Sequence, residues 1–317
     1  MVRRSEILTE IDFASYRTKL YDAASLACEA IDIAVPGGAE LGESPVWDER
    51  LGCLWWVDIK RGLVHRHAPD AEAAGDACRE IGEEVGAVAL REGGGLVLAV
   101  RSGVLLLDDL AGEPRVLADL GAPGVRFNDA KCDPAGRLWA GTLTDDNLAG
   151  GGQLYRVDPD GGATIALDRV TVSNGLDWSL DGRTLCYVDS ATQRVDAIAF
   201  DLERGTLGER RPLIELRADE GIPDGLTVDA DGFLWLALFG GSAVLRIAPD
   251  GSRERIVHVP ISHPTSCAFG GPDLTDLYIT SAAKDLSPAQ RFEHPHAGAV
   301  LKMRPGVRGR PANRFAG

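Results

Sequence analysis

The sequence lacks a basic face and a long hydrophobic run. Its 317 residues include 33 Lys and Arg against 48 Asp and Glu, a net charge of −15. Nucleic acids and anionic membranes bind clustered positive charge, so this balance argues against both as partners. No stretch reaches the roughly 18 consecutive apolar residues typical of a membrane-spanning helix. We therefore expect a soluble protein that binds neither nucleic acid nor a membrane.

Closely spaced cysteines are also absent. The six cysteines lie at least 25 residues apart, which excludes a CxxC zinc or redox pair. Glu6, Glu10 and Asp12 interrupt the N-terminal segment where a secretory signal would be continuously apolar. These features favour a cytoplasmic protein with reduced thiols. The sequence makes no prediction of the oligomeric state.

Glycine, in contrast, is abundant. The chain has 38 glycines, about 12% of its residues against roughly 7% in ordinary domains, and they punctuate short apolar segments along the chain. A turn followed by an apolar strand recurs every 42 to 49 residues, and each copy is followed by a second short strand. The first leucines of these strands are Leu54, Leu96, Leu138, Leu185, Leu234 and Leu277. This spacing is close to the 40–45 residues of a four-stranded propeller blade.

The repeats predict an all-β protein with a six-bladed β-propeller as a single domain over residues 30–317. A β-sandwich would leave six regular repeats unexplained. We expect the early strand in residues 28–36 to pair with the last blade, because a propeller must cover its first and last edges. Residues 1–29 form a short N-terminal extension, and apolar residues at helical spacing within it are compatible with a helix.

The repeats also predict a ring of equivalent residues in the turns that enter the innermost strands. Asn or Asp before Gly is by itself typical of a turn. Five of the six ring residues carry a side-chain oxygen, however, and the first is a Glu, which is no turn former. Converging carboxylate and amide oxygens are ligands for a divalent cation. The ring consists of Glu43, Val85, Asn128, Asn174, Asp224 and Ser266.

Four segments around this ring point to a known family. ELGESPVW, RFNDAKCDPAGRLWAGTL, VSNGLDWSLDG and IPDGLTVDADGFLW resemble the senescence marker protein, regucalcin and gluconolactonase family of six-bladed propeller lactonases. The similarity extends from about residue 38 to 305. The resemblance implies that Glu43, Asn174 and Asp224 bind one divalent cation.

The same resemblance implies a sugar-binding set. It assigns Arg126 and Asn128 to the substrate, and Asp146 is the nearest match to an acidic residue that binds sugar hydroxyls in relatives. Some relatives have Glu at that place, so the side chain here has a shorter reach. His294 and His296 lie in a loop that could border the mouth, whereas His65 and His67 are expected on an outer strand of the first blade.

These residues lead to a functional hypothesis of metal-dependent hydrolysis of a sugar lactone, an aldono-1,4- or 1,5-lactone, to the aldonic acid. The cation would polarise the carbonyl and activate a water molecule. Asp224 is the candidate general base, with Glu43 as the alternative. Ca²⁺ and Zn²⁺ are the favoured cations, and Mn²⁺, Mg²⁺ and Fe²⁺ also suit such ligands. Two other functions remain open: a metal-dependent esterase or organophosphate hydrolase, and a non-enzymatic calcium-binding propeller.

Overall fold

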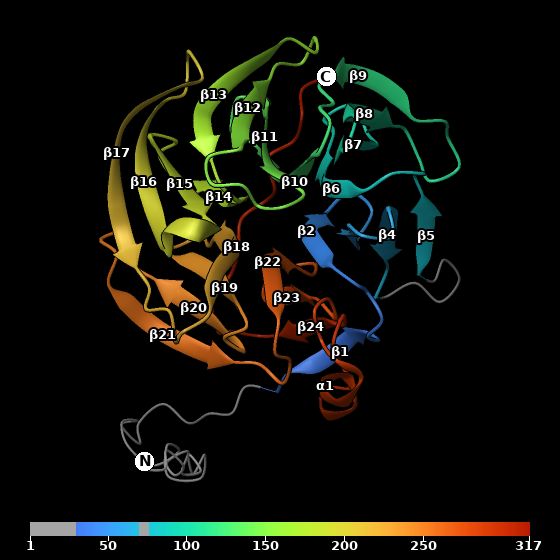
Figure 1. Cartoon of the computed structure of the whole chain (residues 1–317), viewed down its shortest axis with the longest axis vertical. Helices are drawn as coiled ribbons and strands as arrows, with labels where there is room; N and C mark the ends of the chain where they lie inside the picture. The colour runs from blue at the N-terminus through green and yellow to red at the C-terminus, as the bar shows by residue number, and fades with distance from the viewer. Residues whose placement is uncertain (1–29, 70–75) are drawn as a thin grey trace, which may run out of the picture.

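The computed structural model describes residues 30–69 and 76–317. The helix predicted within residues 1–29 lies outside this part of the chain. Six antiparallel four-stranded sheets surround a central axis, as Figure 1 shows. This arrangement confirms the six-bladed propeller predicted from the repeats. No helix in the described ranges is both long enough and apolar enough to cross a membrane.

Five blades are each built from four strands consecutive in the chain, ordered from the axis outward. The first contains β2 (Gly42–Asp48), β3 (Cys53–Asp58), β4 (Leu63–His67) and β5 (Ala77–Glu80). The second contains β6 (Val85–Leu90), β7 (Leu96–Val100), β8 (Gly103–Leu107) and β9 (Arg115–Asp119). The third contains β10 (Val125–Cys132), β11 (Leu138–Thr144), β12 (Gly152–Val157) and β13 (Ala163–Val170). The fourth contains β14 (Ser173–Trp178), β15 (Thr184–Asp189), β16 (Arg194–Asp201) and β17 (Thr206–Glu215). The fifth contains β18 (Ile222–Val228), β19 (Leu234–Phe239), β20 (Ala243–Ile247) and β21 (Arg253–His258).

The sixth blade joins the two ends of the propeller. Its strands are β22 (Pro264–Gly270), β23 (Asp276–Ser281), β24 (Val300–Met303) and β1 (Asp32–Val35). Ile33 lies opposite Leu301 in the antiparallel pair of β1 and β24. The predicted closure is therefore confirmed. It covers what would otherwise be an exposed sheet edge and holds the ring of blades shut.

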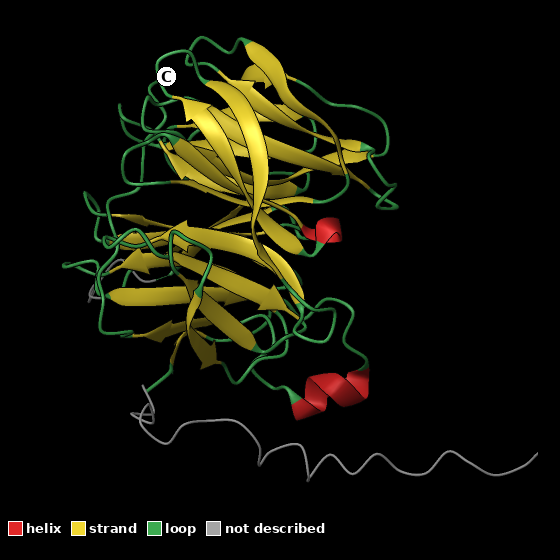
Figure 2. Cartoon of the chain, turned by 90° about the vertical axis from the view of Figure 1, so that its left-hand side faces the viewer, coloured by secondary structure: helices red, strands yellow, loops and turns green. Residues whose placement is uncertain are grey.

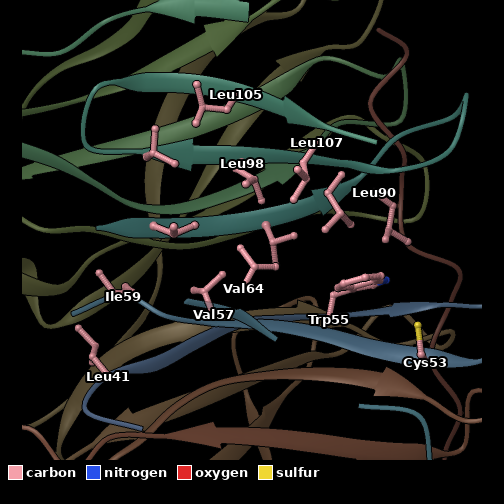
Figure 3. Packing of buried hydrophobic residues seen from close by; sticks show 14 of the residues in the cluster. Leu41, Cys53, Trp55, Val57, Ile59, Val64, Leu90, Leu98, Leu105 and Leu107 are labelled. Atoms are coloured by element: carbon pink, nitrogen blue, oxygen red, sulfur yellow. The ribbon is translucent and has the colours of Figure 1, made fainter. Parts of the chain in front are cut away.

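Apolar side chains fill the spaces between neighbouring blades. Figure 3 shows Trp55, Val57 and Val64 of the first blade facing Leu98 and Leu107 of the second, all of them buried. Full burial of each aliphatic side chain contributes roughly 1.5–3 kcal/mol. The blades are thus locked side by side, so the innermost strands that carry the predicted ring have a fixed relative position.

The aspartates that open the turns between the first two strands of a blade have a structural role. The Asp229 carboxylate accepts hydrogen bonds from the amides of Asp231 and Phe233 at 3.0 and 2.9 Å, and from the Trp235 indole at 3.0 Å. Asp133 likewise accepts from the indole of Trp139 at 2.9 Å. Each aspartate therefore fixes a turn and satisfies the polar atom of a buried tryptophan. The tryptophans are packed within the blades.

The C-terminal segment crosses one end of the central channel, and the red trace in Figure 1 runs over the middle of the molecule to the end of the chain. Arg310 donates to the Asp177 carboxylate at 2.5 Å and to the Trp178 carbonyl at 2.7 Å. Asn313 donates to the Cys132 carbonyl at 3.0 Å. The Phe315 amide bonds to Leu90 at 2.8 Å. This tail closes one face and leaves the opposite face as the open mouth.

Candidate active site

The predicted ring residues all lie on innermost strands. The sequence had suggested that they lie in the turns that lead into these strands. In the structure they lie within the strands themselves. Each innermost strand has an irregular register at or beside its ring residue. Such bulges redirect a side chain away from the regular alternation of a strand. The six strands can thus direct ring side chains towards the mouth.

The glycines that follow Asn174 and Asp224 allow these strands to approach one another. A Cβ atom on Gly175 would lie 2.5 Å from the Asp224 carbonyl oxygen, and one on Gly225 would lie 2.1 Å from the Ser266 hydroxyl oxygen. Both distances are too short for any side chain. The SNG and PDG segments therefore reflect close packing of innermost strands around the axis, and turn formation does not explain them.

A chain of hydrogen bonds connects three blades beneath the mouth. The Arg126 guanidinium donates to the Asn128 side-chain oxygen at 2.8 Å, and Asn128 Nδ2 donates to Asn174 Oδ1 at 3.2 Å. Asn174 Nδ2 donates to the Ser190 hydroxyl at 2.9 Å, which donates to the Pro223 carbonyl at 2.7 Å. The structure therefore brings Arg126, Asn128 and Asn174 together and orients both amides.

Glu43 comes from the first blade and is fixed by its neighbour. Its carboxylate accepts a hydrogen bond from the Ser44 amide at 2.9 Å. Ser44 has a positive φ of 51°, a conformation that costs free energy outside glycine. Two hydrogen bonds between its hydroxyl and the Val88 backbone, at 3.0 and 3.2 Å, hold Ser44 in place. Neighbouring blades thus determine the position of Glu43 before any ligand binds.

The two ring carboxylates lie in an unfavourable environment for negative charge. Glu43 and Asp224 are 4% and 6% exposed. Burial is the main cause that raises the pKa of Glu43 well above its ordinary value, and the charges of Asp224 and Asp129 add to it. Burial, followed by the charge of Asp129, likewise raises the pKa of Asp224. Within the described residues neither carboxylate forms an ion pair.

A divalent cation fits this donor set. It would relieve the repulsion between Glu43 and Asp224, and carboxylate and amide oxygens are its usual ligands. The Asn174 side-chain oxygen has a second lone pair besides the one that accepts from Asn128. No three His, Cys, Asp or Glu side chains cluster as a metal site in the described ranges. The candidate set here has two carboxylates, and its third oxygen belongs to an amide.

A cavity of about 370 Å³ opens above these residues. Arg126, Asn128 and Asp224 line it, as predicted for a substrate site. Glu43 and Asn174 are not among its lining residues. The 3-10 helix η2 (Ser190–Thr192) and the α-helix α1 (Pro288–Glu293) lie on the same side of the propeller in Figure 2. Ser190 and Ala191 of η2 line the cavity, so this side carries the mouth.

Asp146 does not line this cavity in the structure. Its side chain is exposed, and its carboxylate accepts a 3.3 Å hydrogen bond from the Leu148 amide. Asp145 beside it pairs with Arg101 at 2.6 Å. Asn147 instead reaches the cavity wall, with a positive φ of 54°. His294 and His296 are likewise absent from the wall, although they follow α1 on the mouth side.

The sequence did not predict four polar residues of the mouth, of which Asn147 is one. Ser190 orients Asn174, and only its place after a repeat strand could have revealed it. Gln193 lines the cavity in a left-handed conformation, and its side-chain oxygen is buried without a hydrogen-bond partner in the structure described. Lys284 contributes a positive charge from the sixth blade. The sequence repeats could not predict Gln193 and Lys284, because both lie in loops whose lengths differ between blades.

A family model described as SMP-30/Gluconolactonase/LRE-like region matches residues 41–283. The chain belongs to this family. Regucalcin of Xenopus laevis is 39% identical over 90% of this chain and 98% of its own. A Bacillus subtilis (strain 168) protein named "Putative sugar lactone lactonase YvrE" is 37% identical over 88% of this chain and 96% of its own.

A solved relative has the same fold over nearly its whole length. It is a calcium-binding protein, regucalcin, from Agrobacterium tumefaciens strain C58, with a TM-score of 0.84 and 28% identity. The match covers 90% of this chain and 97% of that one. The resemblance read from the four sequence segments is thereby confirmed, and membership of a gluconolactonase family indicates a hydrolase that acts on lactones.

Proposed function

We propose that this protein hydrolyses a sugar lactone to the aldonic acid with the help of one bound divalent cation. The observation that carries the proposal is the pair of buried carboxylates, Glu43 and Asp224, which form no ion pair in the described part of the chain and whose pKa values burial raises. They lie next to the polar cavity that Arg126 and Asn128 line. The lactonase name of the Bacillus relative supports the same reaction.

Glu43, Asn174 and Asp224 would hold the cation, with Ca²⁺ and Zn²⁺ as the favoured ions and Mn²⁺, Mg²⁺ and Fe²⁺ as alternatives. When bound, a divalent cation acts as a Lewis acid that polarises the ester carbonyl and acidifies water. The calcium-binding description of the Agrobacterium relative supports a cation here.

The chain's own residues would position the substrate and move the proton. Asp224 accepts the proton of the attacking water as general base, because it is the ring carboxylate that lines the cavity. The Arg126 guanidinium donates to oxygens of the lactone, and Asn128 orients Arg126 through their 2.8 Å hydrogen bond. The water oxygen bonds to the carbonyl carbon and the acyl–oxygen bond breaks. The ring oxygen takes the proton that Asp224 received and becomes a hydroxyl group of the aldonic acid.

The polyol part of the substrate needs hydrogen-bonding partners on the cavity wall. Asn147 and Gln193 supply them, and the buried side-chain oxygen of Gln193 can accept from a hydroxyl group. Asp146, the contact inferred from the resemblance, would reach the same hydroxyls only after a rearrangement of its loop.

A calcium-binding role without catalysis is the second candidate, favoured by the description of the Agrobacterium relative. A metal-dependent esterase or organophosphate hydrolase would use the same groups on another substrate. Proton release from aldonolactones, aryl esters and phosphotriesters, corrected for spontaneous hydrolysis, ranks these activities by kcat/KM. Turnover of aldonolactones with the highest kcat/KM supports the proposal. A protein that binds Ca²⁺ but accelerates none of these reactions contradicts it.

A further inference from the structure

Lys284 brings a positive charge to the mouth from the blade opposite Arg126. It follows β23 by three residues and lines the same cavity as Arg126, Asn128 and Asp224. Its amide donates to the Glu40 carbonyl at 2.8 Å, and the amide of the preceding Ala283 donates to Ala39 at 3.2 Å. These bonds fix the backbone at the cavity rim, from which the Lys284 side chain extends.

The described residues around Lys284 compensate its positive charge only in part. Within the described residues the Lys284 ammonium forms one ion pair, at 3.4 Å, with the carboxylate of the adjacent Asp285. The two side chains are 37% and 67% exposed, and exposed pairs of this kind contribute little free energy. The charge of Lys284 also acts on the Asp224 carboxylate, where it opposes the rise in pKa that burial causes. His263 adds no second charge nearby, because burial, with a contribution from Lys284 itself, lowers its pKa.

With a divalent cation bound, the charged groups around the cavity would carry a net positive charge. Glu43 and Asp224 would neutralise a divalent cation, and the charge of Lys131 acts on the nearby Asp129. Arg126 and Lys284 then remain as the positive groups that line the cavity. Arg101 pairs with both Glu84 and Asp145, and Lys60 pairs with Glu84 as well, so these acids have partners other than Arg126. Within the described residues Arg126 forms no ion pair and Lys284 forms only the exposed one with Asp285. A neutral lactone would leave both charges largely uncompensated, whereas an anionic lactone would match them.

We propose that Lys284 is a specificity-determining residue that binds an anionic group of the substrate, a carboxylate or a phosphate carried at the end of the lactone remote from the ester. This inference rests on the proposed lactonase function and narrows its substrate class from neutral to negatively charged sugar lactones. Lysine binds either group as a point charge, so both fit.

Matched lactones test the proposal. The pairs are glucono-1,5-lactone with its 6-phosphate, and glucono-1,4-lactone with glucaro-1,4-lactone; within each pair the comparison is between a neutral and an anionic terminal group. We expect Lys284→Met to lower kcat/KM for the anionic member by about tenfold and to change the neutral member by less than about threefold. Lys284→Arg should retain most of the preference, and added salt should weaken it. Which anionic member loses more identifies the group.

Lys302→Met is the matched control, because Lys302 lies on β24 beside a separate surface pocket. Equal losses on both members of a pair would overturn the proposal, since they would show that Lys284 acts only through Asp224. Unchanged kinetics in Lys284→Met would overturn it too.

A binding measurement separates this proposal from the lactonase function itself. Titration calorimetry with glucarate, 6-phosphogluconate and gluconate measures recognition without turnover. We expect the two ligands with the additional anionic group to bind the wild type more tightly than gluconate and to lose about tenfold in affinity in Lys284→Met. Equal affinities for all three in wild type and variant would overturn the role of Lys284. A wild type that binds them but hydrolyses no lactone would refute the lactonase function and leave this recognition intact.

Discussion

Asn128 of the third blade donates a 3.2 Å hydrogen bond from its side-chain nitrogen to the side-chain oxygen of Asn174 in the fourth. This bond joins the residue proposed to orient Arg126 with a proposed cation ligand. Substrate binding and cation binding are therefore coupled through one pair of amides, and a change in either residue should affect both.

Replacing Asp224 with Asn should have opposite effects on activity and on stability. The amide cannot accept a proton as a base, so we expect kcat to fall by about a thousandfold or more. The same change removes a buried negative charge and should raise the Tm of the cation-free protein by a few degrees. Calorimetry with and without Ca²⁺ measures this: the wild type should gain Tm on cation addition, and the variant should not. A cation-free variant with a lower Tm than the wild type would contradict the electrostatic argument.

The pH dependence of the cation-free protein follows from the same carboxylates. Burial raises the pKa of Glu43 and Asp224 in the folded state above their values in the unfolded chain. Below the unfolded pKa both states are protonated, and above it the unfolded chain releases its protons first. The free energy of unfolding should therefore fall as pH rises from about 4 towards the folded pKa. A double variant, Glu43→Gln with Asp224→Asn, should show a smaller fall in chelator-treated samples.

Gln193 should contribute to substrate binding more than to the chemical step. Its buried side-chain oxygen lines the cavity without a partner in the structure as described. We expect Gln193→Leu, which keeps the size and removes the acceptor, to raise KM about tenfold with kcat nearly unchanged. Steady-state kinetics on an aldonolactone measures the two constants separately. An unchanged KM would remove Gln193 from the substrate site.

Asn147 and Asp146 can be compared directly because they are neighbours in one loop. Both residues are exposed, but Asn147 lines the cavity and Asp146 does not. We expect Asn147→Ala to raise KM by about tenfold and Asp146→Ala by less than about twofold. The reverse order would show that the loop rearranges on binding and that the sugar contact implied by the family resemblance holds.

Arg310 should stabilise the propeller from its closed face. Burial alone would raise the pKa of Asp177, but the charges of Arg310 and Lys131 hold it below its ordinary value. Arg310→Ala leaves this carboxylate partly unpaired and should cost about 2 kcal/mol at neutral pH. This contribution is present above the unfolded pKa and is lost as pH falls through the folded one, so the difference from wild type should shrink in acid.

Urea unfolding at several pH values provides the measurement for Arg310. Arg204→Ala serves as the control, because Arg204 forms an exposed pair with Asp201 and its loss should change stability little. A difference between Arg310→Ala and wild type that stays constant down to strongly acidic pH would contradict the ion-pair explanation.

The leucines at regular intervals predicted the blade count, because each begins or lies within the second strand of a blade that must repeat to bury its faces. The ring residues were predicted for the same reason, since equivalent positions in equivalent strands meet at the axis. Their assignment to turns was wrong, because a bulge and a close approach at Gly175 need the neighbouring strand, which local sequence does not contain.

Loop residues were beyond this kind of prediction. Gln193 and Lys284 reach the cavity through connections whose lengths differ between blades, so no repeat position identifies them. The contribution of the C-terminal tail was missed for a related reason. Arg310 and Asn313 are separated by more than 130 residues from their partners Asp177 and Cys132, and no local pattern records such contacts.

Cation binding by Glu43, Asn174 and Asp224 is proposed to enable lactone hydrolysis. The most direct test follows proton release from an aldonolactone by chelator-treated protein as a divalent cation is added back. We expect activity to be lost on chelation and to return with saturation at one cation per chain in the wild type, but to stay absent in Asp224→Asn. Undiminished activity after complete removal of the cation, or wild-type turnover in Asp224→Asn, would contradict this proposal.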